Sequence, residues 1–237
     1  MGEPVRRGRR GRRRNGGRTM NIVEAIAIAG TLSNPEKMPG KSTSIDARRC
    51  ITGSKLAKKK GSVCEHCYAR TGRYRMPNVR AAMERRLDGI QHPLWVLAMS
   101  RLLQRQHWFR WFDSGDLQSV AHLRKIIAVC NATPNVRHWL PTKEHGIVRQ
   151  FLKHGGVLPE NLTVRLSAHM RDEIFASDLP TSMVVDLRPT PEGVWDCPAY
   201  ARNSKHTCES ARCRACWDRG TTVVAYPLHK HGAVKEG

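Results

Sequence analysis

The chain has 237 residues, and its 41 Lys and Arg against 20 Asp and Glu give it a formal net charge of +21 at pH 7. This charge excludes an acidic regulatory protein and favours a polyanionic partner such as nucleic acid. The sequence has no run of 18 apolar residues and no apolar stretch of the kind that a secretory signal needs near its N-terminus, so we expect a cytoplasmic protein with no membrane partner.

The beginning of the chain differs in composition from the rest. Residues 1–20 contain eight arginines, several glycines and one acid, Glu3, which predicts a disordered basic tail whose arginines contact phosphates. The alternative is that translation starts at Met20. Residues 21–237 are expected to form a single α/β domain.

The first half of this domain predicts mainly helices. Residues 21–30 are apolar and predict a strand or a short helix, and residues 51–63 contain four lysines and predict a basic loop. Pro77 is typical of a helix N-terminus and favours a helix over residues 78–90, while residues 93–105 predict an amphipathic helix.

The second half alternates strands with helices. Strands are expected at residues 107–112, 136–140, 162–166, 182–187 and 221–226, and helices at residues 118–130 and 144–154. Alternation of this kind implies right-handed crossovers and a parallel sheet. We therefore predict an α/β fold, a partial (β/α) barrel of about six mainly parallel strands with Cys-rich metal-binding loops.

Polar side chains follow these strands. In parallel sheets, catalytic and ligand-binding residues usually lie at the carboxyl ends of the strands. The residues in such positions are Asp113, Ser114, Asp116, Thr142, Lys143, Ser167, His169, Asp186 and His229. Among them we select Asp113, Lys143 and His169 as catalytic candidates. Two alternatives remain open: Asp113 and Asp116 act as paired carboxylates or as caps of the next helix, and His169 contacts substrate or is structural.

Seven of the eight cysteines fall into two groups that each end in a C-x-x-C step. The groups are Cys50, Cys64 and Cys67, and Cys197, Cys208, Cys213 and Cys216. Without a secretion signal, they are expected to be metal ligands rather than disulfides. Three ligands leave a position open for a small molecule, whereas four close a zinc or iron–sulfur site. Cys130 follows apolar residues at helical spacing and is expected in the core.

The sequence Cys64-Glu65-His66-Cys67-Tyr68 and the later Ser114-Gly115-Asp116 resemble the radical-SAM superfamily in a divergent phage-associated form, the gene product 88 group. The resemblance covers roughly residues 45–230 and implies a phage-encoded protein. It implies a [4Fe–4S] cluster on Cys50, Cys64 and Cys67 whose open iron binds S-adenosylmethionine.

The resemblance also implies roles for the strand-end residues. Asp116, with the backbone of Ser114 and Gly115, would receive the methionine ammonium, and Thr142 and Ser167 match cofactor-binding strand ends in placement. The thirteen residues between Cys50 and Cys64 depart from the family's shorter spacing, and Ser-Gly-Asp replaces Gly-Gly-Glu.

By the same analogy, the Cys-rich segment 197–216 would hold an auxiliary cluster, with zinc as the alternative. The resulting expectation is a radical-SAM-like iron–sulfur enzyme that uses an electron donor and acts on a nucleic-acid-related substrate. The alternative is a non-enzymatic nucleic-acid-binding protein stabilised by zinc or a cluster.

Overall fold

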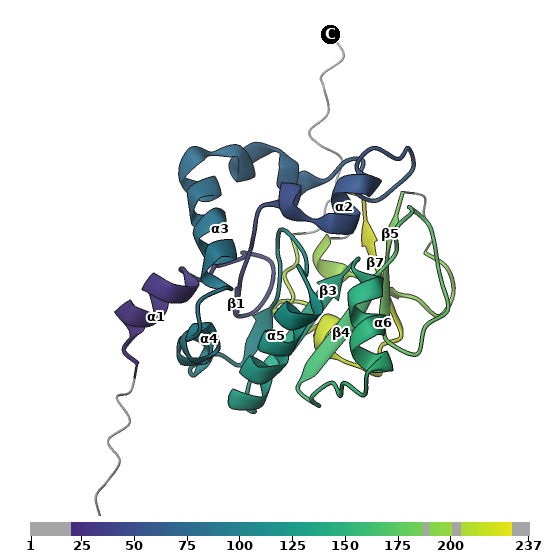
Figure 1. Ribbon diagram of the computed structural model, residues 1–237. Coiled ribbons are helices and arrows are strands. Elements are labelled where there is room, and N and C mark those ends of the chain that lie inside the picture. The colour runs from purple at the N-terminus through teal and green to yellow at the C-terminus, as the bar shows by residue number, and fades with distance from the viewer. Residues whose placement is uncertain (1–19, 187–189, 201–204, 229–237) are drawn as a thin grey trace, which may run out of the picture.

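Seven strands form one sheet in the computed structural model, which describes residues 20–186, 190–200 and 205–228. The strands are β1 (Lys41–Ser42), β2 (Trp108–Arg110), β3 (Arg137–Thr142), β4 (Leu162–Ser167), β5 (Thr181–Val185), β6 (Trp195–Asp196) and β7 (Val223–Pro227). Their order is β1-β2-β3-β4-β5-β7-β6, and every neighbouring pair is parallel. The sheet curls into a half-barrel (Figure 1), which confirms the predicted α/β partial barrel with seven strands in place of about six.

Six α-helices are present in the described residues. They are α1 (Ile22–Ala29), α2 (Ile51–Leu56), α3 (Pro77–Gly89), α4 (Trp95–Leu103), α5 (Val120–Ala132) and α6 (His145–Lys153). Short 3-10 helices lie at Ala47–Arg49, Tyr68–Arg70, Gly72–Arg75, Pro198–Tyr200 and Ala215–Trp217. Figure 1 shows α5 and α6 side by side across one face of the sheet. None of the described helices is long and apolar enough to cross a bilayer.

The two faces of the sheet carry different cores because side chains alternate along each strand. On the helix-covered face, Phe109 and Leu140 join the main apolar core, which also contains Cys130 as expected. On the other face, Trp139 packs against Trp217 of the Cys-rich segment, with ring centroids 5.3 Å apart. The C-terminal cysteines are thus part of a second core on the concave side of the half-barrel.

Several expected boundaries need correction. The basic loop at residues 51–63 begins with helix α2. Of the two alternatives for residues 21–30, a strand or a short helix, helix α1 confirms the second. The strand at 107–112 stops at Arg110, and Phe112 has φ 57, a left-handed conformation that ends the extended chain. The expected tail at residues 1–19 and the strand-end residue His229 lie outside the described residues.

Candidate functional site

A cavity of about 230 Å³ opens where the strands end, and both cysteine groups contribute to its wall. Its thiol-bearing residues are Cys50, Cys64, Cys67, Cys197, Cys208 and Cys216. Of the predicted cofactor residues, Ser114, Gly115, Asp116, Thr142 and Ser167 line it as well, together with Asp113 and Lys143. The fold therefore brings nearly all candidate residues to one site.

The first cysteine group surrounds the start of α2. Cys50 is the residue before the helix, and a Cβ at Gly53 would lie 3.6 Å from the Cys50 Sγ and 3.5 Å from the Cys64 Sγ. A side chain at position 53 would therefore touch both sulfurs, and its Cβ would press on the Cys50 Cβ at 3.0 Å. Burial raises the pKa of both thiols, and for Cys50 the charges of Asp116 and Cys67 raise it further.

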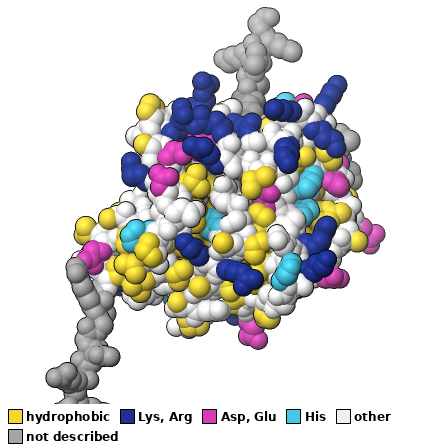
Figure 2. Space-filling view, in the orientation of Figure 1, with side chains coloured by type: hydrophobic (Ala, Val, Ile, Leu, Met, Phe, Trp, Pro, Cys, Tyr) yellow, Lys and Arg dark blue, Asp and Glu magenta, His cyan; other side chains and the backbone are white. Residues whose placement is uncertain are grey.

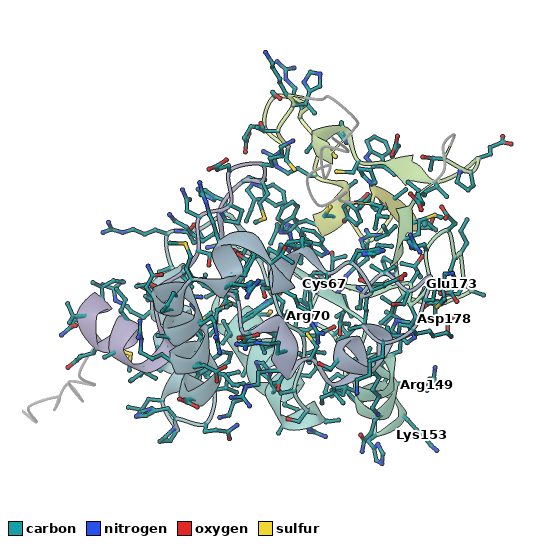
Figure 3. The ribbon with its side chains drawn as sticks, turned by 90° about the horizontal axis from the view of Figure 1, so that it is seen from above. Cys67, Arg70, Arg149, Lys153, Glu173 and Asp178 are labelled. Carbon is teal, nitrogen blue, oxygen red and sulfur yellow. The ribbon has the colours of Figure 1, made fainter. Side chains whose placement is uncertain are left out.

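Cys67 precedes the 3-10 helix Tyr68–Arg70. The Tyr68 hydroxyl donates a hydrogen bond of 2.6 Å to the carbonyl oxygen of Asp113, which fastens this segment to the end of β2. Figure 3 shows Arg70 next to Cys67, and its guanidinium donates to the Ser54 Oγ at 2.9 Å. Arg70 and Lys143 are the two cations that lower the pKa of Cys64 against the effect of burial.

The second cysteine group is more enclosed than the first. Cys197, Cys208, Cys213 and Cys216 are all buried, whereas the three cysteines of the first group are half-buried. The Cys213 amide donates to the Cys208 carbonyl oxygen at 2.9 Å, and the Cys216 Sγ lies 3.0 Å from the Tyr226 hydroxyl. Burial raises the pKa of Cys208 to about 11 and of Cys216 to about 12.

Across the described residues, no group of three or more His, Cys, Asp or Glu side chains lies close enough together to hold a single metal ion. The thiols instead line the wall of the cavity from two sides. His66 is exposed, and its Nε2 lies 3.8 Å from Glu65 Oε2.

The Ser114-Gly115-Asp116 turn is built around Gly115. Its φ of 84° is in the left-handed region, and a Cβ there would lie 2.2 Å from Ile45 Cγ1. Ser114 binds the same residue, because its Oγ donates to the Ile45 carbonyl oxygen at 3.0 Å. The turn therefore packs closely against Ile45, five residues before Cys50.

Asp116 is buried and joins two strand ends. Its Oδ1 accepts from Thr142 Oγ1 at 2.5 Å and from the Leu117 amide at 2.8 Å, while Oδ2 accepts from the Lys143 amide at 2.8 Å. Burial raises the pKa of Asp116 to about 6, although these hydrogen bonds act in the opposite direction. The helix-cap interpretation is wrong, since Ser119 caps α5.

Asp113 differs from Asp116 because one of its carboxylate oxygens accepts no hydrogen bond from the described residues. Its Oδ2 accepts from Ser42 Oγ at 2.6 Å, whereas its buried Oδ1 has no hydrogen-bond partner in the described part of the chain. Asp113 lines the cavity, and this buried oxygen is an acceptor without a donor beside it.

The family model of gene product 88 matches residues 9–219. The chain belongs to the gene product 88 family. This match confirms the resemblance to the phage gene product, and the radical-SAM part of the resemblance stays a prediction. No curated protein and no solved structure matches the chain.

In this gene product 88 family member, the catalytic candidate His169 does not line the cavity. His169 stacks on His145 with ring centroids 4.5 Å apart, and its Nε2 lies 3.0 Å from the Lys143 carbonyl oxygen. The His145 Nε2 lies 3.0 Å from the Ser167 carbonyl oxygen. The two imidazoles therefore hold the ends of β3 and β4 together.

Sequence reasoning missed the residue that anchors α2. Glu144 is buried, and its carboxylate accepts from the Thr52 amide at 2.8 Å and the Thr52 hydroxyl at 2.7 Å. Glu144 directly follows the catalytic candidate Lys143 in the sequence, and it serves to position the helix that follows Cys50. No local signal in the sequence links residues 52 and 144.

Proposed function

We propose that this member of the gene product 88 family is an iron–sulfur enzyme of radical-SAM type, with Cys50, Cys64 and Cys67 as ligands of a [4Fe–4S] cluster. The observation that carries the proposal is the meeting of three thiols at one cavity, at the carboxyl ends of parallel strands. Three cysteines leave one iron of such a cluster without a protein ligand.

The donor set fits a cluster of this kind. Each cysteine of a cluster binds a different iron, so the sulfurs surround the group instead of meeting at one atom. Gly53 leaves space beside the sulfurs of Cys50 and Cys64 that any other residue would fill. When bound, the cluster supplies the electron that cleaves a carbon–sulfur bond of S-adenosylmethionine.

The residues around the cavity would orient that cosubstrate. We assign the methionine ammonium to the free Oδ1 of Asp113, because the oxygens of Asp116 already accept hydrogen bonds from Leu117, Thr142 and Lys143. A charged donor and a carboxylate form a stronger hydrogen bond than two neutral groups. Asp116 then acts as a positioning residue that holds the ends of β2 and β3.

Lys143 and the aromatic wall complete the site. The Lys143 ammonium opposes the rise in the pKa of Cys50 and Cys64, which favours the thiolates that bind iron. Phe112 and Trp139 line the cavity with apolar surface and exclude water from a reactive group.

The second cysteine group would hold an auxiliary cluster, with zinc as the alternative. Cys197, Cys208 and Cys216 reach the same cavity as the first group, but all four thiols are buried and packed with Trp217 and Tyr226, so a bound group would be more enclosed by protein here than at the first group. A site capped by four cysteines stabilises structure or carries electrons.

Anaerobic reconstitution followed by iron and sulfide analysis tests the proposal. Two [4Fe–4S] clusters would give about eight irons per chain, and Cys67→Ala would lower this to about four. Cys130→Ala is the matched control, because Cys130 is buried in the main core away from the cavity and its loss should leave the iron content unchanged.

A colourless protein that retains only zinc would refute the iron–sulfur proposal. An intact cluster that fails to cleave S-adenosylmethionine with a strong reductant would refute the radical-SAM part. That second result would favour the alternative function, a non-enzymatic nucleic-acid-binding protein stabilised by its metal, for which the net charge of +21 is the supporting observation.

A further inference from the structure

A strongly positive surface borders the cavity. Residues 48–86 contain twelve Lys and Arg but only two acids, Glu65 and Glu84. Figure 2 shows these basic side chains along the upper edge of the molecule, over α2 and the segment that leads to α3. We call the basic rim the set of exposed cations Lys55, Lys58, Lys59, Lys60, Arg73 and Arg75.

The acids of this region are already paired with cations outside the basic rim. Glu65 binds Arg171 at 3.1 Å, and Glu84 binds Arg49 at 3.0 Å. Within the described residues, none of the six rim cations forms an ion pair or a side-chain hydrogen bond. Such a set of like charges produces a positive potential that a polyanion would neutralise.

The lysine part of the rim is fixed next to the cavity. The Val63 amide donates to the His169 carbonyl oxygen at 3.0 Å, and the Arg171 amide donates to the Gly61 carbonyl oxygen at 3.0 Å. Val63 itself lines the cavity. The segment that directly follows the three consecutive lysines at 58–60 is therefore tied to the chain that leaves the carboxyl end of β4, beside the cavity.

The aromatic ring of Tyr68 lies, in the sequence, between the four lysines of the basic rim and its two arginines, Arg73 and Arg75. Tyr68 is 38% exposed and lines the cavity. Its hydroxyl is bound to the Asp113 carbonyl oxygen, and its ring meets Tyr74 edge-on with centroids 5.9 Å apart. A ring fixed in this way beside cations is the arrangement on which proteins stack the bases of single strands.

We propose that a single-stranded nucleic acid binds with its phosphates along the basic rim and one base stacked on Tyr68 at the mouth of the cavity. The single strand follows from the geometry, because a base within a duplex must leave its stack before it reaches an enclosed site. The inference names a substrate class for the proposed enzyme and in that respect rests on the proposed function. The binding step itself needs no cluster.

Fluorescence anisotropy of the full chain with labelled single strands of about 20 nucleotides, DNA and RNA, tests the rim. The decisive variant is Arg73→Gln with Arg75→Gln. It should weaken binding about tenfold or more and reduce the slope of log K against log salt concentration by about 1.4, as expected for two lost phosphate contacts. RNA and DNA both support the proposal, and the tighter one identifies the substrate.

The matched control removes the same charge elsewhere. Arg149→Gln with Lys153→Gln changes two exposed cations on α6, which Figure 3 shows away from Cys67. This control should keep the affinity within about twofold. Equal losses in the two double variants, or none in either, would overturn the proposal.

The stacking role of Tyr68 has its own test. Tyr68→Leu should weaken binding at least about fivefold, whereas Tyr68→Phe keeps the ring and should bind within about threefold of the parent. Equal affinity of Tyr68→Leu and the parent would overturn the stacking, and a duplex or polyglutamate that binds as tightly as the single strand would overturn the partner class.

The two proposals fail separately. A colourless protein that still binds single strands through the rim would refute the iron–sulfur function and leave this inference intact. A cluster-bearing protein that cleaves S-adenosylmethionine but ignores nucleic acid would do the reverse.

Discussion

Arg165 shows how one side chain can hold a whole segment of the chain. It is fully buried on β4, and its guanidinium donates to the carbonyl oxygens of Thr181, Ala215, Asp218 and Thr221 at 2.8–3.1 Å. These acceptors belong to β5 and to the segment that carries Cys213 and Cys216 in the chain. Arg165 thus fixes the second cysteine group to the concave face of the sheet.

Arg165→Met should lower the free energy of unfolding by about 3 kcal/mol or more, because several buried carbonyl groups would lose their donor. Urea denaturation measures the effect. Arg149→Met is the control, since Arg149 is exposed on α6 and its replacement should change stability by less than about 0.5 kcal/mol. A loss below about 1 kcal/mol for Arg165→Met would show that the segment is held by other contacts.

At Gly115, the addition of a single methyl group is expected to lower the stability of the protein. Gly115→Ala should destabilise the protein by about 2–4 kcal/mol, because the new Cβ meets Ile45 and the backbone is left-handed. Gly146 of α6 has no atom within 4 Å of such a Cβ, so Gly146→Ala should be neutral or stabilise by about 0.5 kcal/mol. Thermal melts of the two variants compare them directly, and equal melting temperatures would contradict this reasoning.

At the scale of elements, α2 depends on a contact that is distant in the sequence. The helix has only six residues, too few to be stable alone, and Glu144 accepts both hydrogen bonds of Thr52 in its first turn. The start of α6 therefore stabilises the helix that follows Cys50. The hydrogen bonds between Thr52 and Glu144 therefore also hold Cys50, the residue before α2, in place.

Glu144→Gln should loosen α2, because the neutral amide replaces two charge-assisted acceptors with one neutral acceptor and one donor, and the Thr52 hydroxyl would have to accept a bond instead of donating one. Bonds to charged groups contribute about 1.5–3 kcal/mol, so hydrogen exchange of the α2 amides should accelerate by roughly 10- to 100-fold. Glu160→Gln, at an exposed position, is the control. Unchanged exchange in α2 would mean that Glu144 is not its anchor.

At the scale of the whole molecule, acid should weaken the fold through its buried histidines. Burial lowers the pKa of His122 and of His138 to about 3, so both are neutral in the folded protein, whereas in the unfolded chain they take up protons below about pH 6.5. The unfolded state then binds more protons, and stability falls as the pH falls from about 6.5 toward 3.

Between pH 6.5 and 5, each histidine should cost about 1.5 kcal/mol of unfolding free energy. Asp116 acts in the opposite direction, since its pKa of about 6 exceeds the unfolded value of 3.8, and it should return about 1 kcal/mol over the same range. Urea titrations at the two pH values should therefore show a net loss of about 2 kcal/mol. His122→Gln should reduce that loss, and equal stability at both pH values would contradict the assignment.

Local patterns in the sequence determined most elements. The apolar periodicities of residues 120–132 and 145–153, and the strands that precede them, are short-range signals and were predicted within a few residues. The two-residue strands β1 and β6 were missed because so short a segment has no periodicity. Helix α2 was missed because its lysines and glycine resemble a loop and its anchor is far away.

The tertiary structure decided which of these residues meet. The cysteine spacing by itself left open whether there were one or two sites, and it is the curled sheet that turns Cys50 and Cys197 toward one cavity. It likewise moved His169 out of the cavity wall and left Asp113, rather than Asp116, with a free oxygen. Such outcomes depend on contacts between residues far apart in the chain, for which neither composition nor local spacing carries a signal.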